Sequence, residues 1–127
     1  MTTVIDCTMR DGGYYNEWDF SADFVTDYLH LMDQIGVTHV ELGFRFLKSK
    51  NHSGPWAYTP ESLIQEYETP SALKLGVMVN LSELKDALPP TLEKMFPAGS
   101  KLHFVRVACH FEELSELGRL VEFLAGR

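Results

Sequence analysis

The residues best suited to chemistry follow the first apolar segment of the chain, where Arg10 and Asp11 precede two glycines. A guanidinium is a permanent cation that can stabilise an oxyanion, and a carboxylate oxygen is a hard ligand for a divalent metal. A second carboxylate, Glu41, is flanked by Val40 and Leu42. Because an unpaired charge among apolar side chains is costly to desolvate, Glu41 is expected to need a cationic partner.

Two interpretations of Arg10, Asp11 and Glu41 are open from the residues alone. In the first, the ends of neighbouring strands bring the three side chains together as a functional cluster. In the second, Arg10 and Glu41 form an ion pair that only neutralises a buried charge. Both interpretations require Glu41 to face Arg10.

Four short apolar segments are predicted to be the buried strands that position these residues. They cover residues 3–7, 37–44, 73–79 and 102–108. Helices are predicted after each of these segments. The first is capped by Ser21 and stopped by Gly36, and the second has Thr59 as its cap, Pro60 in its first turn and Tyr67 at its end. The third covers 82–88, is ended by Pro89 and Pro90 and is followed by a further turn over 92–96, and the last covers 112–124. Residues 8–13, 14–20 and 45–58 are predicted to be loops, the last of them on the surface.

The repeated strand–helix order predicts one α/β domain over residues 1–127, built on a parallel sheet. Two architectures share this order: an open doubly wound sheet and a segment of a (β/α) barrel. In both, ligands bind at the carboxyl ends of the strands, which is where Arg10 and Asp11 are expected.

Composition excludes several classes of partner. The 127 residues include 11 Lys and Arg against 18 Asp and Glu, for a formal charge of −7, so no nucleic-acid partner is expected. No apolar run is long enough for a membrane span and the amino terminus does not resemble a signal peptide, so a cytoplasmic protein without a membrane partner is expected. Cys7 and Cys109 are interpreted as small buried hydrophobic residues.

Three stretches of the sequence resemble one enzyme family: Asp6-Cys7-Thr8-Met9-Arg10-Asp11-Gly12-Gly13-Tyr14, Asn16-Glu17-Trp18-Asp19-Phe20 and Val40-Glu41-Leu42-Gly43-Phe44. They are similar to the metal-dependent TIM-barrel lyases named for an Asp, Arg and Glu signature, which include 4-hydroxy-2-oxovalerate aldolases, 3-hydroxy-3-methylglutaryl-CoA lyase and the isopropylmalate and homocitrate synthases. The resemblance implies a parallel (β/α)4 segment, the N-terminal half of a TIM-type (β/α)8 barrel of typically ~250 residues.

The resemblance also implies roles for individual residues. Asp11 matches the family's ligand for a divalent metal, Mg²⁺ or Mn²⁺, which acts as a Lewis acid on the 2-oxo group of the substrate. Arg10 matches the arginine that steadies the enolate oxygen, and Glu41 matches the glutamate that holds this arginine in place. The expected substrate is therefore a small 2-oxo acid of the pyruvate type, cleaved or formed by an aldolase-like lyase.

The sequence departs from the family in two places. Tyr14 stands where the aldolases carry a histidine that acts as the base, and a tyrosine with an ordinary pKa near ~10 is expected to act as an acid or hydrogen-bond donor instead. The family completes its metal site with a His-x-His pair, and none of the five histidines belongs to such a pair. Metal binding by this chain alone is therefore expected to be weak or absent, and the chain itself a poor catalyst.

Three further residues, within or just after the expected strands, are weaker candidates for lining a substrate. Arg106, inside the fourth apolar segment, needs an acidic partner, which Glu41 or Asp11 could supply. Asn80 and His110 follow the third and fourth segments; a capping role is favoured for Asn80, and a capping or surface role for His110.

The alternative to an enzyme is a non-catalytic half-barrel that serves as an assembly fragment or self-associates. Four units leave two sheet edges unpaired, so a homodimer or larger assembly through these edges is expected. An open-sheet sugar or nucleotide binder is disfavoured, because no glycine pattern that cradles phosphate opens a helix.

Overall fold

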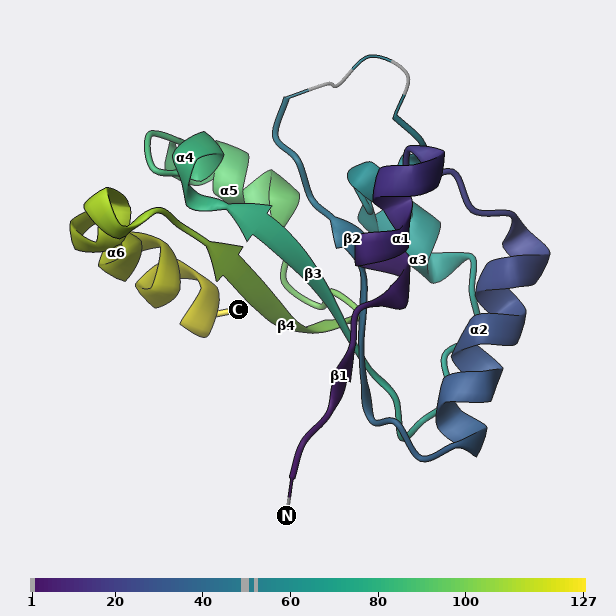
Figure 1. The fold of residues 1–127 in the computed structure, drawn as a ribbon. Coiled ribbons are helices and arrows are strands. Elements are labelled where there is room, and N and C mark those ends of the chain that lie inside the picture. Colours follow the sequence, from purple (N-terminus) through teal and green to yellow (C-terminus); the bar gives the residue numbers. More distant parts are fainter. Residues whose placement is uncertain (1, 49–50, 52) are drawn as a thin grey trace.

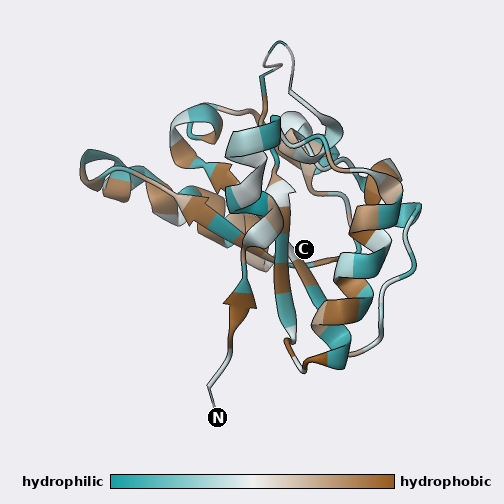
Figure 2. Ribbon diagram, turned by 45° about the vertical axis from the view of Figure 1, so that its right-hand side comes forward, coloured by the Kyte–Doolittle hydropathy of each residue, from teal (hydrophilic) through white to brown (hydrophobic). Residues whose placement is uncertain are grey.

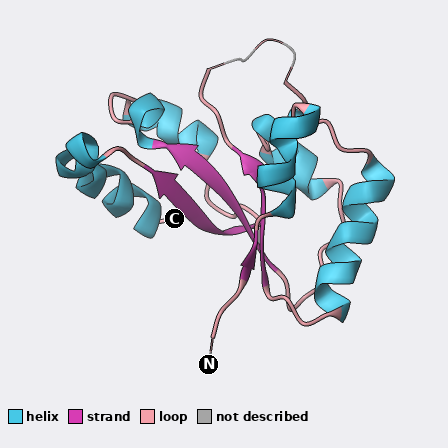
Figure 3. Cartoon of the chain, viewed as in Figure 1, coloured by secondary structure: helices cyan, strands magenta, loops and turns pink. Residues whose placement is uncertain are grey.

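The computed structural model describes residues 2–48, 51 and 53–127, and these residues form a parallel sheet with helices packed on it (Figures 1 and 3). The strands are β1 (Ile5–Asp6), β2 (His39–Phe44), β3 (Lys74–Asn80) and β4 (Leu102–Ala108). Each lies within or close to a segment predicted to be a strand, although β1 is shorter than expected. Residues 49, 50 and 52 of the predicted surface loop lie outside the described residues.

The order of strands in the sheet is β1-β2-β3-β4, and every neighbouring pair is parallel. A doubly wound sheet reverses its strand order at a switch point, whereas a barrel adds each strand beside the last. Right-handed crossovers between strands in this order place the intervening helices on one face. The fold is therefore a (β/α)4 half-barrel, as the family resemblance implied, and the open-sheet alternative is wrong.

Six α-helices and two short 3-10 turns connect and follow the strands in the described part of the chain. They are α1 (Thr8–Asn16), α2 (Ala22–Gln34), η1 (Pro55–Ala57), α3 (Glu61–Gln65), α4 (Leu81–Leu84), α5 (Pro89–Met95), η2 (Phe111–Glu113) and α6 (Leu114–Ala125). Ser21 caps α2 through a hydrogen bond from the Phe24 amide to its hydroxyl (3.2 Å), which confirms the predicted start of that helix.

The segment after β1 was predicted to be a loop and is the helix α1 instead. Its first turn is fixed by Asp6, whose carboxylate accepts hydrogen bonds from the backbone N–H (3.0 Å) and hydroxyl (3.2 Å) of Thr8. Met9 is fully buried, so the helix is anchored in the core as well. Two adjacent glycines normally disfavour a helix, and here the packing of a tryptophan overrides that preference.

Two predicted helix starts are also corrected. Thr59 does not cap α3, because Pro60 occupies the cap position and the Thr59 hydroxyl donates to the carbonyl oxygen of Phe44 at 2.8 Å. Pro89 and Pro90 do not end the short helix predicted over 82–88. They occupy the first turn of α5, where the backbone N–H that proline lacks would have no partner within the helix. The expected helix over 82–88 is therefore the single turn α4.

The hydrophobic core lies between the sheet and the helices that cover it, and the strands carry much of the hydrophobic sequence (Figure 2). Val40 and Leu42 of β2 pack with Val25 and Leu29 of α2 in one buried cluster. Val79 of β3 belongs to a second cluster with residues of α4, α5 and α6. In the described residues, no helix is long and apolar enough to cross a membrane.

Candidate functional site

Glu41 is the centre of the candidate site. Its side chain is fully buried on the opposite face of β2 from Val40 and Leu42. One carboxylate oxygen accepts a hydrogen bond from Arg10 Nε at 2.7 Å and another from Arg106 Nη2 at 2.9 Å. The other oxygen accepts from Arg106 Nε at 2.5 Å. The predicted contact between Arg10 and Glu41 is present, and Glu41, not Asp11, is the partner that Arg106 required.

Arg10 is positioned by the short helix α1, which begins directly after β1. The indole Nε1–H of Trp18 donates to the carbonyl oxygen of Arg10 at 3.0 Å. The indole ring occupies the space beside Gly13, where a Cβ atom would lie 1.9 Å from its Cδ1 atom. The side chain of Arg10 lies over the ring of Phe44, 5.9 Å from its centroid.

Phe44 reaches Arg10 because β2 carries an irregularity next to the site. The register with β3 shifts between Glu41 and Phe44: Glu41 lies opposite Gly76, and Phe44, three residues later, lies opposite Met78, only two residues later. A bulge of this kind changes which face the following side chain occupies, and bulges are common beside functional sites. Gly43 is required within it, because a Cβ atom there would lie 2.0 Å from the carbonyl oxygen of Trp56.

The electrostatics keep both arginines charged. Burial disfavours the charged form of Arg10, but the hydrogen bond and negative charge of Glu41 outweigh it, so its pKa is raised. The hydrogen bond to Glu41 raises the pKa of Arg106 in the same way. Burial raises the pKa of Cys7, whose thiol therefore stays protonated beside these groups. The cluster offers fixed cations and no activated thiolate.

Asp11 and Tyr14 lie at the exposed margin of the site. The Asp11 side chain is 62% exposed, and its carboxylate pairs with Arg10 Nη1 at 2.5 Å. Tyr14 is 64% exposed and contacts Trp18 edge to face, with ring centroids 4.9 Å apart. Among the described residues, the Tyr14 hydroxyl makes no hydrogen bond, and this group is accessible from solvent.

The residues present do not fit a divalent metal. Among the described residues, no three His, Cys, Asp or Glu side chains are grouped so that they could hold an ion. Asp11 is the one carboxylate at the margin, and Arg10 already occupies it. One monodentate carboxylate is far fewer than the six oxygen ligands that Mg²⁺ prefers, so no chemical step is assigned here to a metal.

Asn80 and His110 were the remaining sequence candidates. Asn80 ends β3 at the cap position of α4, but its side chain makes no capping hydrogen bond, so the favoured capping role is wrong. His110 is exposed and caps η2: its side chain accepts from the backbone of Glu113, and its own N–H donates to the Glu113 carboxylate at 3.1 Å. The capping or surface role predicted for His110 is confirmed, and no hydrogen bond or ion pair joins either residue to Glu41 in the described part of the chain.

Comparison with known proteins supports the architecture. No protein-family model matches the chain, and no curated protein matches it. A solved structure described as the "N-terminal domain of a putative aldolase" from Bacteroides vulgatus is similar, with a TM-score of 0.83 and 27% sequence identity. The match covers 98% of this chain and 42% of that chain. The chain is an aldolase-like half-barrel that spans less than half the length of this neighbour.

Sequence reasoning missed the buried environment of Arg45, which was assigned to a surface loop. Arg45 is 4% exposed and donates to the carbonyl oxygens of Thr59 (2.6 Å) and Met95 (2.6 Å) and to the carboxylate of Glu61 (3.1 Å). Burial lowers its pKa against the opposing effect of Glu61. Trp56 and Ala57 are also buried, so both ends of the predicted loop contribute to the core. This arginine is structural and lies apart from Glu41.

Proposed function

We propose that this chain supplies the arginine and glutamate portion of an aldolase-type active site that acts on a 2-oxo acid through its enolate. The observation that carries the proposal is the convergence of two guanidiniums on the fully buried Glu41, next to the carboxyl end of β1. The likeness to a half-barrel from an aldolase-like protein supports the same conclusion.

The chemistry follows from a fixed cation. When the bond beside a 2-oxo group breaks, negative charge develops on the oxo oxygen, and preorganised N–H donors stabilise that charge. Glu41 and Trp18 fix Arg10 from two sides, so its guanidinium does not have to reorganise during the reaction. The accessible hydroxyl of Tyr14 would act as a proton donor at the same margin, in keeping with its ordinary role as a weak acid.

The proposal places a Mg²⁺ or Mn²⁺ ion only in the complete family site. There Asp11 would contribute one ligand, and the remaining ligands would have to come from outside the described residues. We therefore propose that the chain by itself binds the acid but turns it over poorly.

The test separates binding from turnover. Oxalate, a planar dianion that mimics a pyruvate enolate, is titrated into the wild-type chain and into Arg10→Gln by calorimetry. Saturable binding by the wild type and at least about tenfold weaker binding by Arg10→Gln are expected, as for the loss of a charged hydrogen bond. Equal binding by both would refute the proposed site. Rapid aldol turnover from pyruvate, an aldehyde and Mn²⁺ with the chain alone would refute its catalytic incompleteness.

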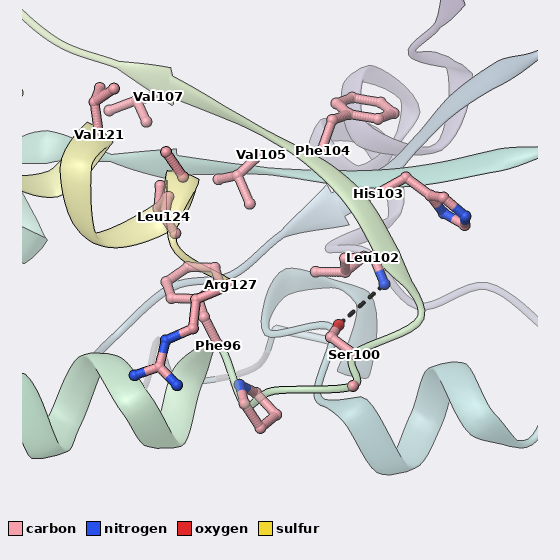
Figure 4. A pocket seen from close by; sticks show the side chains of 13 residues that line it. Phe96, Ser100, Leu102, His103, Phe104, Val105, Val107, Val121, Leu124 and Arg127 are labelled. Carbon is pink, nitrogen blue, oxygen red and sulfur yellow. Dashed lines mark hydrogen bonds between the residues drawn. The ribbon is translucent and has the colours of Figure 1, made fainter.

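We propose a second role, assembly with another copy of the chain, on a separate observation. An apolar groove of about 530 Å³ lies beside β4, the last strand of the sheet in the described residues (Figure 4). Val105 and Val107 of β4 line it together with Val121 and Leu124 of α6. In a repeating (β/α) fold, the next strand and helix would fill such a groove.

A second copy of the chain would fit both free edges of the described sheet. These edges belong to the outer strands β1 and β4, and at β1 the apolar residues Val4 and Ile5 are exposed. In a symmetric dimer, β1 of each copy would pair with β4 of the other, and these two contacts would close an eight-stranded ring. The test is the mass of the chain in solution across a concentration series. A dimer that dissociates in Val105→Lys is expected, with the exposed Lys74→Gln as the control. A monomer at all concentrations would refute the assembly.

A further inference from the structure

Arg106 and Arg10 differ in how much of the side chain is accessible to a ligand. Both arginines bind Glu41, but the Arg106 side chain is 38% exposed and that of Arg10 is 14% exposed. Arg106 uses Nε and Nη2 for Glu41, and no contact with Nη1 is found among the described residues. A permanently charged donor group is therefore presented on the open inner face of β4, in the interior of the half-barrel.

The negative charges of the cluster are shared unequally between the two arginines. Arg10 pairs with both Glu41 and Asp11, whereas Arg106 pairs with Glu41 and has no contact with Asp11. Arg106 therefore shares its one carboxylate with a second cation. This partial neutralisation makes the region beside Arg106 attractive to a small anion.

We propose that Arg106 binds the carboxylate group of the substrate, beside the oxygen that Arg10 stabilises. This inference rests on the proposed function and adds a specificity-determining residue that the family signature does not include. One oxygen of Glu41 accepts hydrogen bonds from both arginines, so the two guanidiniums lie side by side across a single atom. A 2-oxo acid carries its carboxylate and its oxo group on adjacent carbons, which matches two neighbouring donors.

The substrate class follows from this arrangement. A carboxylate next to the reacting oxygen would be selected, whereas an aldehyde or ketone without that carboxylate would leave Arg106 unpaired. Such a ligand would forgo a charged hydrogen bond from Arg106, so discrimination of about tenfold is expected. The competing explanation is that Arg106 only neutralises Glu41, in which case ligands with one and two carboxylates would be affected equally by its removal.

The experiment compares oxalate, with two adjacent carboxylates, and acetate, with one. Both are titrated into the wild type, Arg106→Gln, Arg106→Lys and Arg10→Gln, and chemical shifts of the arginine Nε–H groups are followed by NMR. Lys74→Gln controls for the loss of one positive charge, because Lys74 is exposed and is the first residue of β3. We expect Arg106→Gln to weaken oxalate binding about tenfold and to abolish the preference for oxalate over acetate.

The outcomes separate this inference from the proposed function. If Arg106→Gln binds oxalate as the wild type does while Arg10→Gln does not, Arg106 is only a partner of Glu41 and the inference is overturned. If the wild type binds neither anion, both proposals fail together. If Arg106→Gln does not fold, Arg106→Lys decides: it keeps the charge but not the planar fork, and an unchanged preference for oxalate would overturn the inference.

Discussion

The indole N–H of Trp18 donates to the carbonyl oxygen of Arg10 at 3.0 Å, which couples an aromatic core residue to the cation of the candidate site. Trp18 is 8% exposed and contacts Phe44 and Phe46 edge to face. The geometry of α1, and with it the direction of the Arg10 side chain, therefore depends on how this indole ring is seated beside Gly13.

Alanine substitutions at the two adjacent glycines of α1 are predicted to have opposite effects. Gly12→Ala meets only Phe20, at an ordinary 3.8 Å, so the reduced freedom of the unfolded chain should stabilise the protein by about 0.5–1 kcal/mol. Gly13→Ala would place its Cβ 1.9 Å from the ring of Trp18 and should destabilise by about 1–3 kcal/mol. Urea unfolding followed by circular dichroism measures both, and equal stabilities would contradict the role assigned to Trp18.

Removing the charge of Glu41 is predicted to be costly. In Glu41→Gln, an amide replaces a fully buried carboxylate that two arginines share, so a loss of about 3 kcal/mol in the free energy of unfolding is expected. Glu93→Gln is the matched control, because Glu93 pairs with Arg127 at 3.2 Å while 59% exposed and should change stability by less than about 1 kcal/mol. Similar losses in both variants would argue against a buried charge cluster.

Several features of the site could be predicted because they follow from simple constraints. A carboxylate between Val40 and Leu42 must find a cation, and parallel strands bring their carboxyl ends to one edge. These two arguments were enough to place Glu41 beside Arg10 and to offer it as a partner for Arg106. The strand positions were also predictable, since short apolar segments bounded by polar residues have few alternatives.

The remaining features depend on tertiary contacts that a local pattern does not contain. The two glycines of α1 indicate a loop by propensity, and only the packing of Trp18 against Gly13 explains a helix there. Arg45 follows a strand and precedes polar residues, so its burial becomes visible only when Thr59, Met95 and Glu61 are brought to it from distant segments. Bulges such as the one at Gly43 likewise have no reliable local signal.

Arg45 is predicted to be essential for folding. Arg45→Met would leave the carbonyl oxygens of Thr59 and Met95 without their donor and the carboxylate of Glu61 without its cation, with only the Ser100 hydroxyl still donating to it. The expected cost is about 3–5 kcal/mol. Arg119→Met is a suitable control, because Arg119 also donates to a backbone carbonyl, that of Ala87 at 2.7 Å, but is exposed. Its loss should cost about 1 kcal/mol or less. Thermal unfolding of both variants would show whether burial sets the difference.

Asp6 is predicted to make stability depend on pH in the acid range. Burial acts to raise the pKa of Asp6, but hydrogen bonds from the Tyr28 hydroxyl (2.6 Å) and from Thr8 outweigh it, and the pKa lies below its ordinary value of 3.8. A carboxyl whose pKa is depressed in the folded state stabilises the protein above its unfolded pKa. That stabilisation is lost as the pH falls through the folded pKa.

Tyr28→Phe tests this dependence, because it removes the hydroxyl donor and keeps the ring that packs in the core. The variant should be less stable than the wild type by about 1.5–3 kcal/mol at pH 7, as expected for one hydrogen bond to a charged group. Because a protonated Asp6 no longer gains from this donor, the difference should shrink as the pH falls below 3.8. Tyr15→Phe, at a side chain that is 95% exposed, should behave as the wild type at every pH. Unfolding in urea between pH 2 and 7 measures the three proteins, and a difference that grows in acid would show that Tyr28 acts through another contact.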